Sequence, residues 1–207
     1  MSEVVGAIAA GFASASLLDR INLVLGLVGV WLMIRRSLSA FPVGLVAVAV
    51  QGVLFFQSRF YADAALQVFF FVTLAWGWWR WSAEQSVAPE TPVQRLSFRG
   101  WGYALGAGVL ATVVWALALR HWTDAVMPWR DAFIAAFSVV AQVLQARRNL
   151  ENWPLWIVVN CVAIAAYWRA ELAYTAFLYA LYLVLGIAGW RAWRRAPQVS
   201  TPDSPAP

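Results

Sequence analysis

The chain is poor in the side chains on which most enzyme chemistry depends. Its 207 residues include one cysteine, Cys161, one histidine, His121, and no lysine. A single cysteine provides neither an internal disulfide nor a thiolate metal cluster, and a lone histidine in a predicted loop gives no basis for a histidine metal site or a Ser-His-Asp triad. We therefore expect no catalytic residue, no metal and no cofactor, and a protein that is not an enzyme.

Charged side chains are also scarce, because Asp, Glu, Lys and Arg together make up only 12% of the residues. No Asp, Glu or Arg lies well inside a long apolar segment, which disfavours a proton relay or an ion-coupled pump. The polar groups inside these segments are neutral. Besides tyrosines and tryptophans they are Gln51, Gln67, Thr73, Ser138, Gln142, Gln145, Asn160 and Thr175.

The chain is rich in long apolar segments. It is 62% hydrophobic with 14 tryptophans and a mean hydropathy of +0.66, values that indicate an integral membrane protein. Crossing ~30 Å of hydrocarbon takes roughly 20 helical residues, and no segment shows the alternation of a barrel strand. We predict an all-α membrane protein with seven spans. They cover residues 20–35, 41–57, 61–81, 101–120, 131–147, 153–169 and 172–193.

The sequence repeats itself at a distance of 112 residues. Residues 19–81 align with residues 131–193 over 63 positions without a gap, and fifteen positions are identical. The identities include an aspartate, an arginine pair, a proline and a closing Gly-Trp-x-x-Trp. A duplicated set of three apolar segments is a known way to build a transporter that holds its substrate between the halves.

The number of spans in each copy determines the expected topology. Three spans would leave the second copy inverted, so the extra span within residues 100–121 restores a common orientation, in a 3+1+3 arrangement with parallel repeats. The apolar residues 1–18 are an N-terminal segment, either an interfacial helix or a partial insertion. Residues 82–99 are predicted to be a loop and residues 196–207 a disordered tail, rich in proline, serine and threonine.

The arginines predict the orientation. All fifteen basic residues are arginines, and this topology puts ten of them on the side of residues 82–99 and of the C-terminus, against five on the other side. By the positive-inside rule the richer side is cytoplasmic, so the N-terminus lies outside. The net charge of +5 then reflects topology and attraction to anionic membrane lipids, and no nucleic-acid partner is expected.

Candidate substrate-binding residues emerge from helical spacing. Trp153, Trp156, Asn160 and Tyr167 fall at i, i+3, i+7 and i+14, on one face of the sixth span. That face offers aromatic surface for stacking and an amide for hydrogen bonds. The repeat partners of Trp156 and Asn160 are Gly44 and Val48, so a bulky face opposes a small one and leaves room for a ligand.

Three further candidates extend this face onto other spans. Gln51 lies seven residues beyond Gly44, on the same side of the second span. Gln67 and Tyr179 occupy equivalent positions of the third and seventh spans, and Tyr182 follows Tyr179 by one turn. The predicted site therefore comprises Gln51, Gln67, Trp153, Trp156, Asn160, Tyr179 and Tyr182.

Each of these residue types also has a structural interpretation. Tryptophans near span ends are usually interface anchors, which is the favoured role for Trp78, Trp79, Trp81, Trp101, Trp190 and Trp193 and an open alternative for Trp153. Buried Asn and Gln often bond neighbouring helices. Asp19 and Asp131 are most simply N-caps, and Pro42 and Pro154 are most simply first-turn residues.

Two blocks of the sequence carry specific motifs. The first contains Phe55 to Gln57, Tyr61 to Phe71, Gly77, Trp78 and Trp81; the second contains Glu151 to Ile157, Asn160, Tyr174 to Ala176 and Leu178-Tyr179. Both blocks resemble the PnuC-type vitamin transporter family, named for nicotinamide riboside uptake. The resemblance spans about residues 19–195. It implies a SWEET-like fold, with a ligand between the halves.

The resemblance also implies a function: facilitated uptake of nicotinamide riboside or a related pyridine nucleotide precursor across a bacterial inner membrane. A cytoplasmic kinase then traps the vitamin by phosphorylation. The expected partners are the small-molecule vitamin, membrane lipids and, functionally, that kinase, while a homo-oligomer is left open. A membrane enzyme or a non-transporting scaffold is the alternative of another class.

The chain departs from the nicotinamide riboside pattern at two positions. Family members that carry this vitamin have asparagines where this chain has Ala47 and Leu74. If those asparagines bind the substrate, the loss of each one weakens the binding free energy of an unaltered ligand by on the order of 1 to 3 kcal/mol. Either Gln51 and Thr73 compensate from neighbouring positions, or the substrate is another vitamin of the same family, thiamine or riboflavin.

Overall fold

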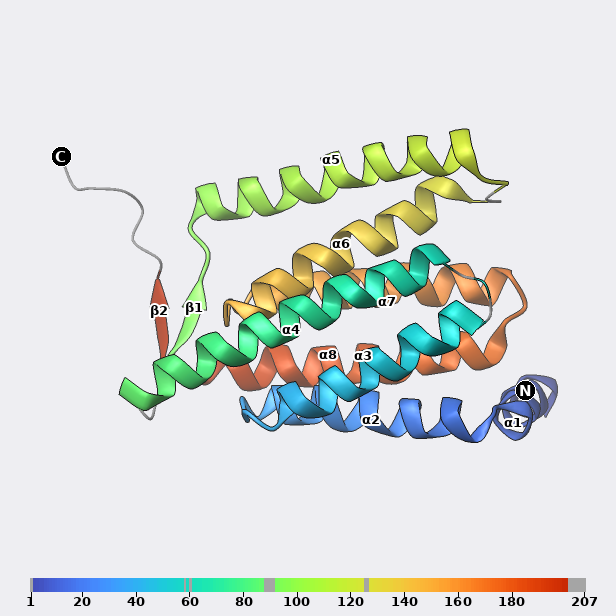
Figure 1. Cartoon of the computed structure of the whole chain (residues 1–207), viewed down its shortest axis with the longest axis horizontal. Coiled ribbons are helices and arrows are strands. Elements are labelled where there is room, and N and C mark those ends of the chain that lie inside the picture. The colour runs from blue at the N-terminus through green and yellow to red at the C-terminus, as the bar shows by residue number, and fades with distance from the viewer. Residues whose placement is uncertain (1, 58, 60, 88–91, 125–126, 201–207) are drawn as a thin grey trace.

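The computed structural model describes residues 2–57, 59, 61–87, 92–124 and 127–200. These residues form eight helices and one pair of short strands (Figure 1). The helices are α1 (Ser2–Ser14), α2 (Leu17–Ile34), α3 (Ala40–Gln57), α4 (Tyr61–Val87), α5 (Phe98–Trp122), α6 (Pro128–Ala146), α7 (Asn152–Arg169) and α8 (Ala173–Arg194); the strands are β1 (Val93–Arg95) and β2 (Gln198–Ser200).

Each of the seven predicted spans coincides with one helix, from α2 to α8. Four of these helices, α2, α3, α5 and α8, are long and apolar enough to cross a bilayer by length and composition alone. Large apolar side chains are exposed on the outer faces, as α5 shows with Val109, Leu110 and Val114. Such a surface fits lipid rather than water. The chain is thus a multi-pass helical membrane protein.

The start of α2 differs from the prediction. The N-cap is Ser16, whose hydroxyl accepts a hydrogen bond from the Asp19 backbone N–H, while the Asp19 carboxylate accepts one from the Ser16 backbone N–H. This is a capping box, with Asp19 as its third helical residue rather than the N-cap itself. Asp131 likewise lies in the first turn of α6, which begins at Pro128. The boundary at residue 18 therefore falls inside α2.

The 112-residue repeat is visible in the backbone. Arg36 and Arg148, which are repeat partners, both adopt positive φ, of 56° and 61°, just after α2 and α6. Arg59 and Glu171, another pair of partners, do the same at 62° and 59° after α3 and α7. A positive φ is costly for residues other than glycine, so its recurrence at equivalent positions is a specific structural signature of duplication. Pro42 and Pro154 both stand third in their helices, as expected for first-turn prolines.

The two copies of the repeat, here called the first half (α2–α4) and the second half (α6–α8), close into a ring. Within each half, neighbouring helices pack in chain order, and between the halves α4 contacts α6 and α8 contacts α2. Helix α5 packs on α6, outside the ring, and α1 lies at the end of the bundle where α2 begins (Figure 1). The arrangement leaves the centre of the ring available for a site.

The other end of the bundle, where α2, α4, α6 and α8 finish, is called here the arginine-rich end. There β1 and β2 pair in parallel, with Val93 opposite Gln198. The prediction of a loop over residues 82–99 is therefore wrong for the end of α4 and for β1, and that of a disordered tail is wrong for Gln198–Ser200. The backbone of the tail gains partners from a distant segment, which local composition does not reveal. Residues 201–207 lie outside the described residues.

Candidate functional site

A cavity of about 670 Å³ lies between the two halves, within the size range of small-molecule sites. Its wall comes from all six ring helices, from Gly11 of α1 and from Ala15, which follows α1. All seven residues of the predicted site line it: Gln51, Gln67, Trp153, Trp156, Asn160, Tyr179 and Tyr182. Helical spacing combined with the repeat thus brought together residues from four helices that do share one cavity.

The aromatic part of the wall is ordered by contacts among its own rings. Tyr167 of α7 and Tyr179 of α8 stack with centroids 5.2 Å apart and ring planes 22° apart. Trp156 donates a hydrogen bond from Nε1 to Oε1 of Gln145 at 2.9 Å, which fixes its indole across the gap between α7 and α6. Rings held in this way lose little conformational entropy when a flat ligand stacks on them.

The amide groups divide into those that join helices and those with free hydrogen-bonding atoms. Asn22 donates from Nδ2 to Oε1 of Gln51, so Gln51 links α3 to α2, and Gln145 links α6 to α7. The structural interpretation of buried amides therefore applies to these two glutamines. In contrast, Asn22 Oδ1, Gln142 Nε2 and Trp153 Nε1 are buried and have no hydrogen-bond partner within the described residues.

All three residues line the cavity, and the three atoms, one acceptor and two donors, lie just beneath its surface. A buried polar atom without a partner costs about 1 to 3 kcal/mol, which a ligand group can offset. Sequence reasoning overlooked Asn22 because its repeat partner is apolar Ile134. The signal it missed was an amide one turn after Asp19, in an otherwise apolar helix.

The cavity is almost free of charge. Among its lining residues only Asp19 carries a formal charge, and none is a lysine, arginine or histidine. A phosphate or carboxylate is normally held by such cations or by several backbone N–H groups. The site is therefore suited to a neutral or positively charged ligand with flat rings and hydrogen-bonding edges.

Ala47 and Leu74, the two positions that depart from the nicotinamide riboside pattern, also line this cavity. Gln51 lies one turn from Ala47 and reaches the cavity as well, whereas Thr73 donates its hydroxyl hydrogen bond to the Phe69 carbonyl of its own helix, at 2.8 Å. Thr73 is not among the lining residues. Of the two proposed compensating groups, only Gln51 is therefore in place.

A reciprocal pair of tryptophans, Trp81 and Trp193, lies in the core cluster that also contains the cavity-lining residues Met33, Ala40 and Trp153. Trp81 of α4 donates from Nε1 to the Ala146 carbonyl of α6 at 3.0 Å, and its repeat partner Trp193 of α8 donates to the Met33 and Ile34 carbonyls of α2 at 3.2 Å. Each half thereby bonds to the first helix of the other. Both rings are buried, so the prediction of interface anchors is wrong for these two residues.

The ring packing around these tryptophans is duplicated too. Phe41 meets Trp81 edge-on at 5.0 Å and 82°, and Trp153, the partner of Phe41, meets Trp193 at 5.5 Å and 85°. Trp153 is 2% exposed, so it is a packed floor residue of the cavity and not an interface anchor. Its unpartnered Nε1 distinguishes it from Trp81 and Trp193, whose indole nitrogens are bonded.

We expect Trp81→Phe and Trp193→Phe each to lower the free energy of unfolding by about 1 kcal/mol, because each removes one donor and keeps an aromatic ring in the core. Thermal unfolding of the purified chain in detergent measures the effect. The partner carbonyls then lose their indole donor, which is the reason for the cost. Trp190→Phe is the matched control, because Trp190 is only partly buried and has no such bond among the described contacts. If Trp81→Phe and Trp193→Phe were as stable as the Trp190→Phe control, the reciprocal bonding would be contradicted.

A further contact joins the halves at the arginine-rich end. The buried Arg148 guanidinium lies 3.0 Å from the Glu84 carboxylate and 4.1 Å above the Trp81 ring. Burial lowers the pKa of Arg148 to about 10, while the Glu84 charge opposes that shift. Arg148 stays protonated at neutral pH, so the ion pair holds α4 against the loop after α6.

Nearby, burial raises the pKa of Glu151, which accepts a hydrogen bond from the Leu96 backbone N–H at 3.1 Å.

No group of three or more His, Cys, Asp or Glu side chains converges as a metal site in the part of the chain that the structure describes. The recognisable chemistry of the cavity is thus stacking and hydrogen bonding.

The comparisons with known proteins agree with one another. The sequence profile of the family described as nicotinamide mononucleotide transporter matches residues 16–195. Among curated relatives, the nicotinamide riboside transporter PnuC of Escherichia coli (strain K12) is 25% identical over 211 residues, which cover 90% of this chain and 88% of that one. The riboflavin/roseoflavin transporter RibM of Streptomyces davaonensis is 29% identical over 183 residues, covering 84% and 83%.

A solved structure supports the same relationship at the level of the fold. The crystal structure of the vitamin B3 transporter PnuC matches with a TM-score of 0.72 at 23% identity, covering 93% of this chain and 88% of that chain.

Proposed function

The chain belongs to the nicotinamide mononucleotide transporter family, and we propose that it carries an unphosphorylated vitamin precursor, nicotinamide riboside, across the membrane by facilitated diffusion. The observation that carries this proposal is the absence of cationic side chains among the residues that line the cavity, beside a wall of ordered aromatic rings. Nicotinamide riboside has a flat, positively charged pyridinium ring and no phosphate. The faces of Trp and Tyr attract such a cation.

The polar atoms of the cavity fit the rest of this ligand. The carboxamide of nicotinamide both donates and accepts hydrogen bonds, and Gln142 Nε2, Trp153 Nε1 and Asn22 Oδ1 supply two donors and one acceptor. We assign substrate binding to the seven predicted residues together with Asn22 and Gln142. A nucleotide is a poorer ligand, since its phosphate would be desolvated without a cation.

Riboflavin is the second candidate, and a specific observation favours it. Ala47 and Leu74 make the cavity more apolar than the nicotinamide riboside pattern would, and both line it. A relative of similar coverage is named a riboflavin/roseoflavin transporter. A larger ring system could use the apolar surface that these residues provide.

The transport mechanism that we propose is alternating access without ion coupling. The seven spans form a 3+1+3 arrangement with parallel repeats, and α1 is an interfacial helix at the outer end. The positive-inside rule places the arginine-rich end in the cytoplasm of a bacterium, beneath its inner membrane. Release of cargo at that end would require the reciprocal bonds of Trp81 and Trp193 and the Arg148–Glu84 pair to break. A cytoplasmic kinase would then trap the vitamin.

Uptake into proteoliposomes tests the function. Labelled nicotinamide riboside, nicotinamide mononucleotide and riboflavin are each added outside vesicles that contain the purified chain. We expect nicotinamide riboside to equilibrate across the membrane without concentrating, at a rate that ionophores leave unchanged. A kinase and ATP enclosed in the vesicles should convert equilibration into accumulation. Uptake of none of the three would instead favour a scaffold or a membrane enzyme, and accumulation driven by an ion gradient would refute uncoupled diffusion.

A further inference from the structure

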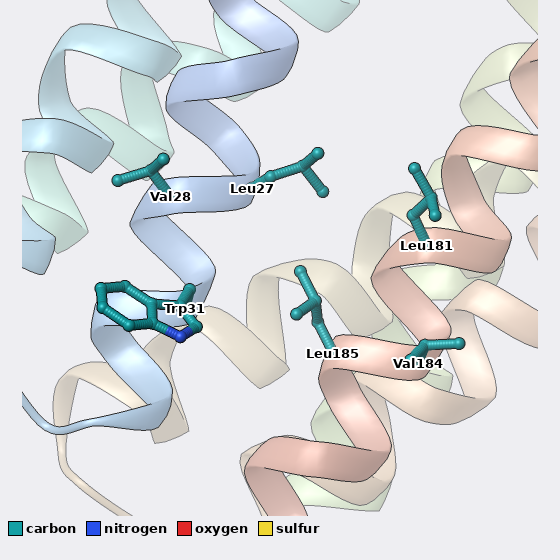
Figure 2. A pocket seen from close by; sticks show the side chains of 6 residues that line it. All are labelled: Leu27, Val28, Trp31, Leu181, Val184 and Leu185. Carbon is teal, nitrogen blue, oxygen red and sulfur yellow. The ribbon is translucent and has the colours of Figure 1, made fainter.

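A second, smaller cavity lies on the outer surface of the ring, in the seam between α2 and α8. It has a volume of about 390 Å³ and is lined by apolar side chains alone: Leu27, Val28, Trp31, Leu181, Val184 and Leu185. Figure 2 shows Leu27 of α2 pointing across the gap towards Leu181 of α8, with Leu185 also on the gap side, while Val28, Trp31 and Val184 lie at the rims of the gap. We call this the α2–α8 groove. It is separate from the central cavity, whose lining includes none of these six residues.

Each helix of the groove carries an arginine beyond its apolar residues, towards the arginine-rich end. Arg35 follows Val28 by seven residues on α2, and Arg191 follows Val184 by seven residues on α8, so each arginine continues the groove face of its helix towards the arginine-rich end. Arg35 is held over the Trp31 ring at 4.9 Å. Both arginines are exposed, and no carboxylate forms an ion pair with either within the described residues.

The α2 wall of the groove is more exposed than the equivalent face of α6 in the second half. In the second half, α5 packs on α6, and Val140, the repeat partner of Val28, is half-buried against the same core cluster as Leu96, which precedes α5, and Trp101 of α5. The first half has no counterpart of α5, and Val28 is 40% exposed. The α2 wall of the groove is therefore more open than its counterpart on α6, whereas on α8 Val184 and its repeat partner Val72 are both exposed, at 64% and 60%.

We propose that the α2–α8 groove binds an anionic phospholipid, with one acyl chain along the apolar residues and the phosphate between Arg35 and Arg191. The groove matches the chemistry of a hydrocarbon chain, and two arginines at its end match a negative headgroup. The site also adjoins the transport path. Leu181 and Leu185 of α8 face the groove, whereas Tyr182 and Gly186 between and after them line the central cavity. A bound lipid thus braces the helix that carries part of the substrate site.

Lipid titrations of the purified full chain in detergent test this proposal independently of the cargo. Dioleoyl-phosphatidylglycerol, dioleoyl-phosphatidylcholine and inorganic phosphate are titrated separately, and the dissociation constant is taken from the rise in melting temperature. We expect phosphatidylglycerol to bind most tightly. Each arginine contributes about fivefold, so Arg35→Gln with Arg191→Gln should weaken phosphatidylglycerol binding roughly twenty-five-fold and leave phosphatidylcholine binding unchanged.

The matched control is Arg99→Gln, which removes an exposed arginine at the same end of the bundle but at the start of α5, on the far side of the ring. It should leave the lipid preference intact. A second variant, Leu181→Trp, fills the groove and should weaken both lipids. Equal binding of the two lipids by the unaltered chain, or unchanged preference in the double variant, would overturn the proposal. A matching effect of inorganic phosphate would assign the arginines to a free anion, and a chain dimer that Leu181→Trp dissociates would assign the groove to a second copy.

Discussion

Trp156→Ala should reduce uptake of the cargo by about a hundredfold, while the protein still inserts into the membrane. The substitution removes the indole that Gln145 holds in place at 2.9 Å and with it a large part of the stacking surface of the cavity. Losing a buried aromatic anchor of a binding site commonly costs 2 kcal/mol or more, which corresponds to at least a thirtyfold loss of affinity. Initial rates in proteoliposomes, normalised to the amount of reconstituted protein, measure the effect.

Asn160→Ala should have a similar effect through a different loss, because it removes the one amide on the α7 face of the cavity. Each variant has a matched control in the same protein. Trp79→Ala removes a tryptophan that is 70% exposed on α4, and Cys161→Ala changes the exposed neighbour of Asn160. Both controls should transport at the rate of the unaltered chain. Normal rates in the Trp156→Ala and Asn160→Ala variants would refute the assignment of the site.

Gly189→Ala should destabilise the protein by about 1 to 3 kcal/mol, an overpacking effect at the floor of the cavity. A Cβ atom at this position would lie 2.6 Å from three atoms of the Trp153 indole, which is closer than packed carbon atoms approach. The indole cannot withdraw easily, since it already packs edge-on against Trp193 at 5.5 Å. The melting temperature of the purified chain in detergent should fall by several degrees.

The control for this substitution is Gly106→Ala in α5. No atom lies within 4 Å of a Cβ built there, so alanine should be tolerated and should raise helix stability by up to about 1 kcal/mol. The two glycine substitutions are thus expected to change the melting temperature in opposite directions. A melting temperature for Gly189→Ala at or above that of the unaltered chain would show that the Trp153–Trp193 packing is looser than described.

The positions of the helices were predictable because they depend on properties that are local in sequence. Apolar length gave seven segments that coincide with α2 to α8, and the repeat assigned equivalent roles to the loops that contain Arg36 and Arg148. The grouping of Trp156, Asn160 and Tyr179 around one cavity was also predictable, since helical periodicity determines which residues share a face.

What the sequence did not reveal depends on partners that are distant along the chain. β1 and β2 are three residues each, in polar segments, and their pairing joins residues more than a hundred positions apart. Trp81 and Trp193 looked like interface anchors because aromatic residues at span ends usually are, and only the packing of one half on the other buries them. Asn22 was missed because its repeat partner is apolar Ile134, and its bond to Gln51 joins α2 to α3 within the first half.

The most direct test of the central claim, that the cavity between the halves binds an unphosphorylated vitamin, is ligand-dependent thermal stabilisation of the purified chain. Nicotinamide riboside, nicotinamide mononucleotide, riboflavin and thiamine are compared at equal concentrations, with the Trp156→Ala variant alongside. We predict that nicotinamide riboside raises the melting temperature and binds at least about tenfold more tightly than its 5′-phosphate, because the cavity offers no cation to the phosphate. The Trp156→Ala variant should lose most of this stabilisation. Equal or tighter binding of the mononucleotide, or full stabilisation of the variant, would contradict the account.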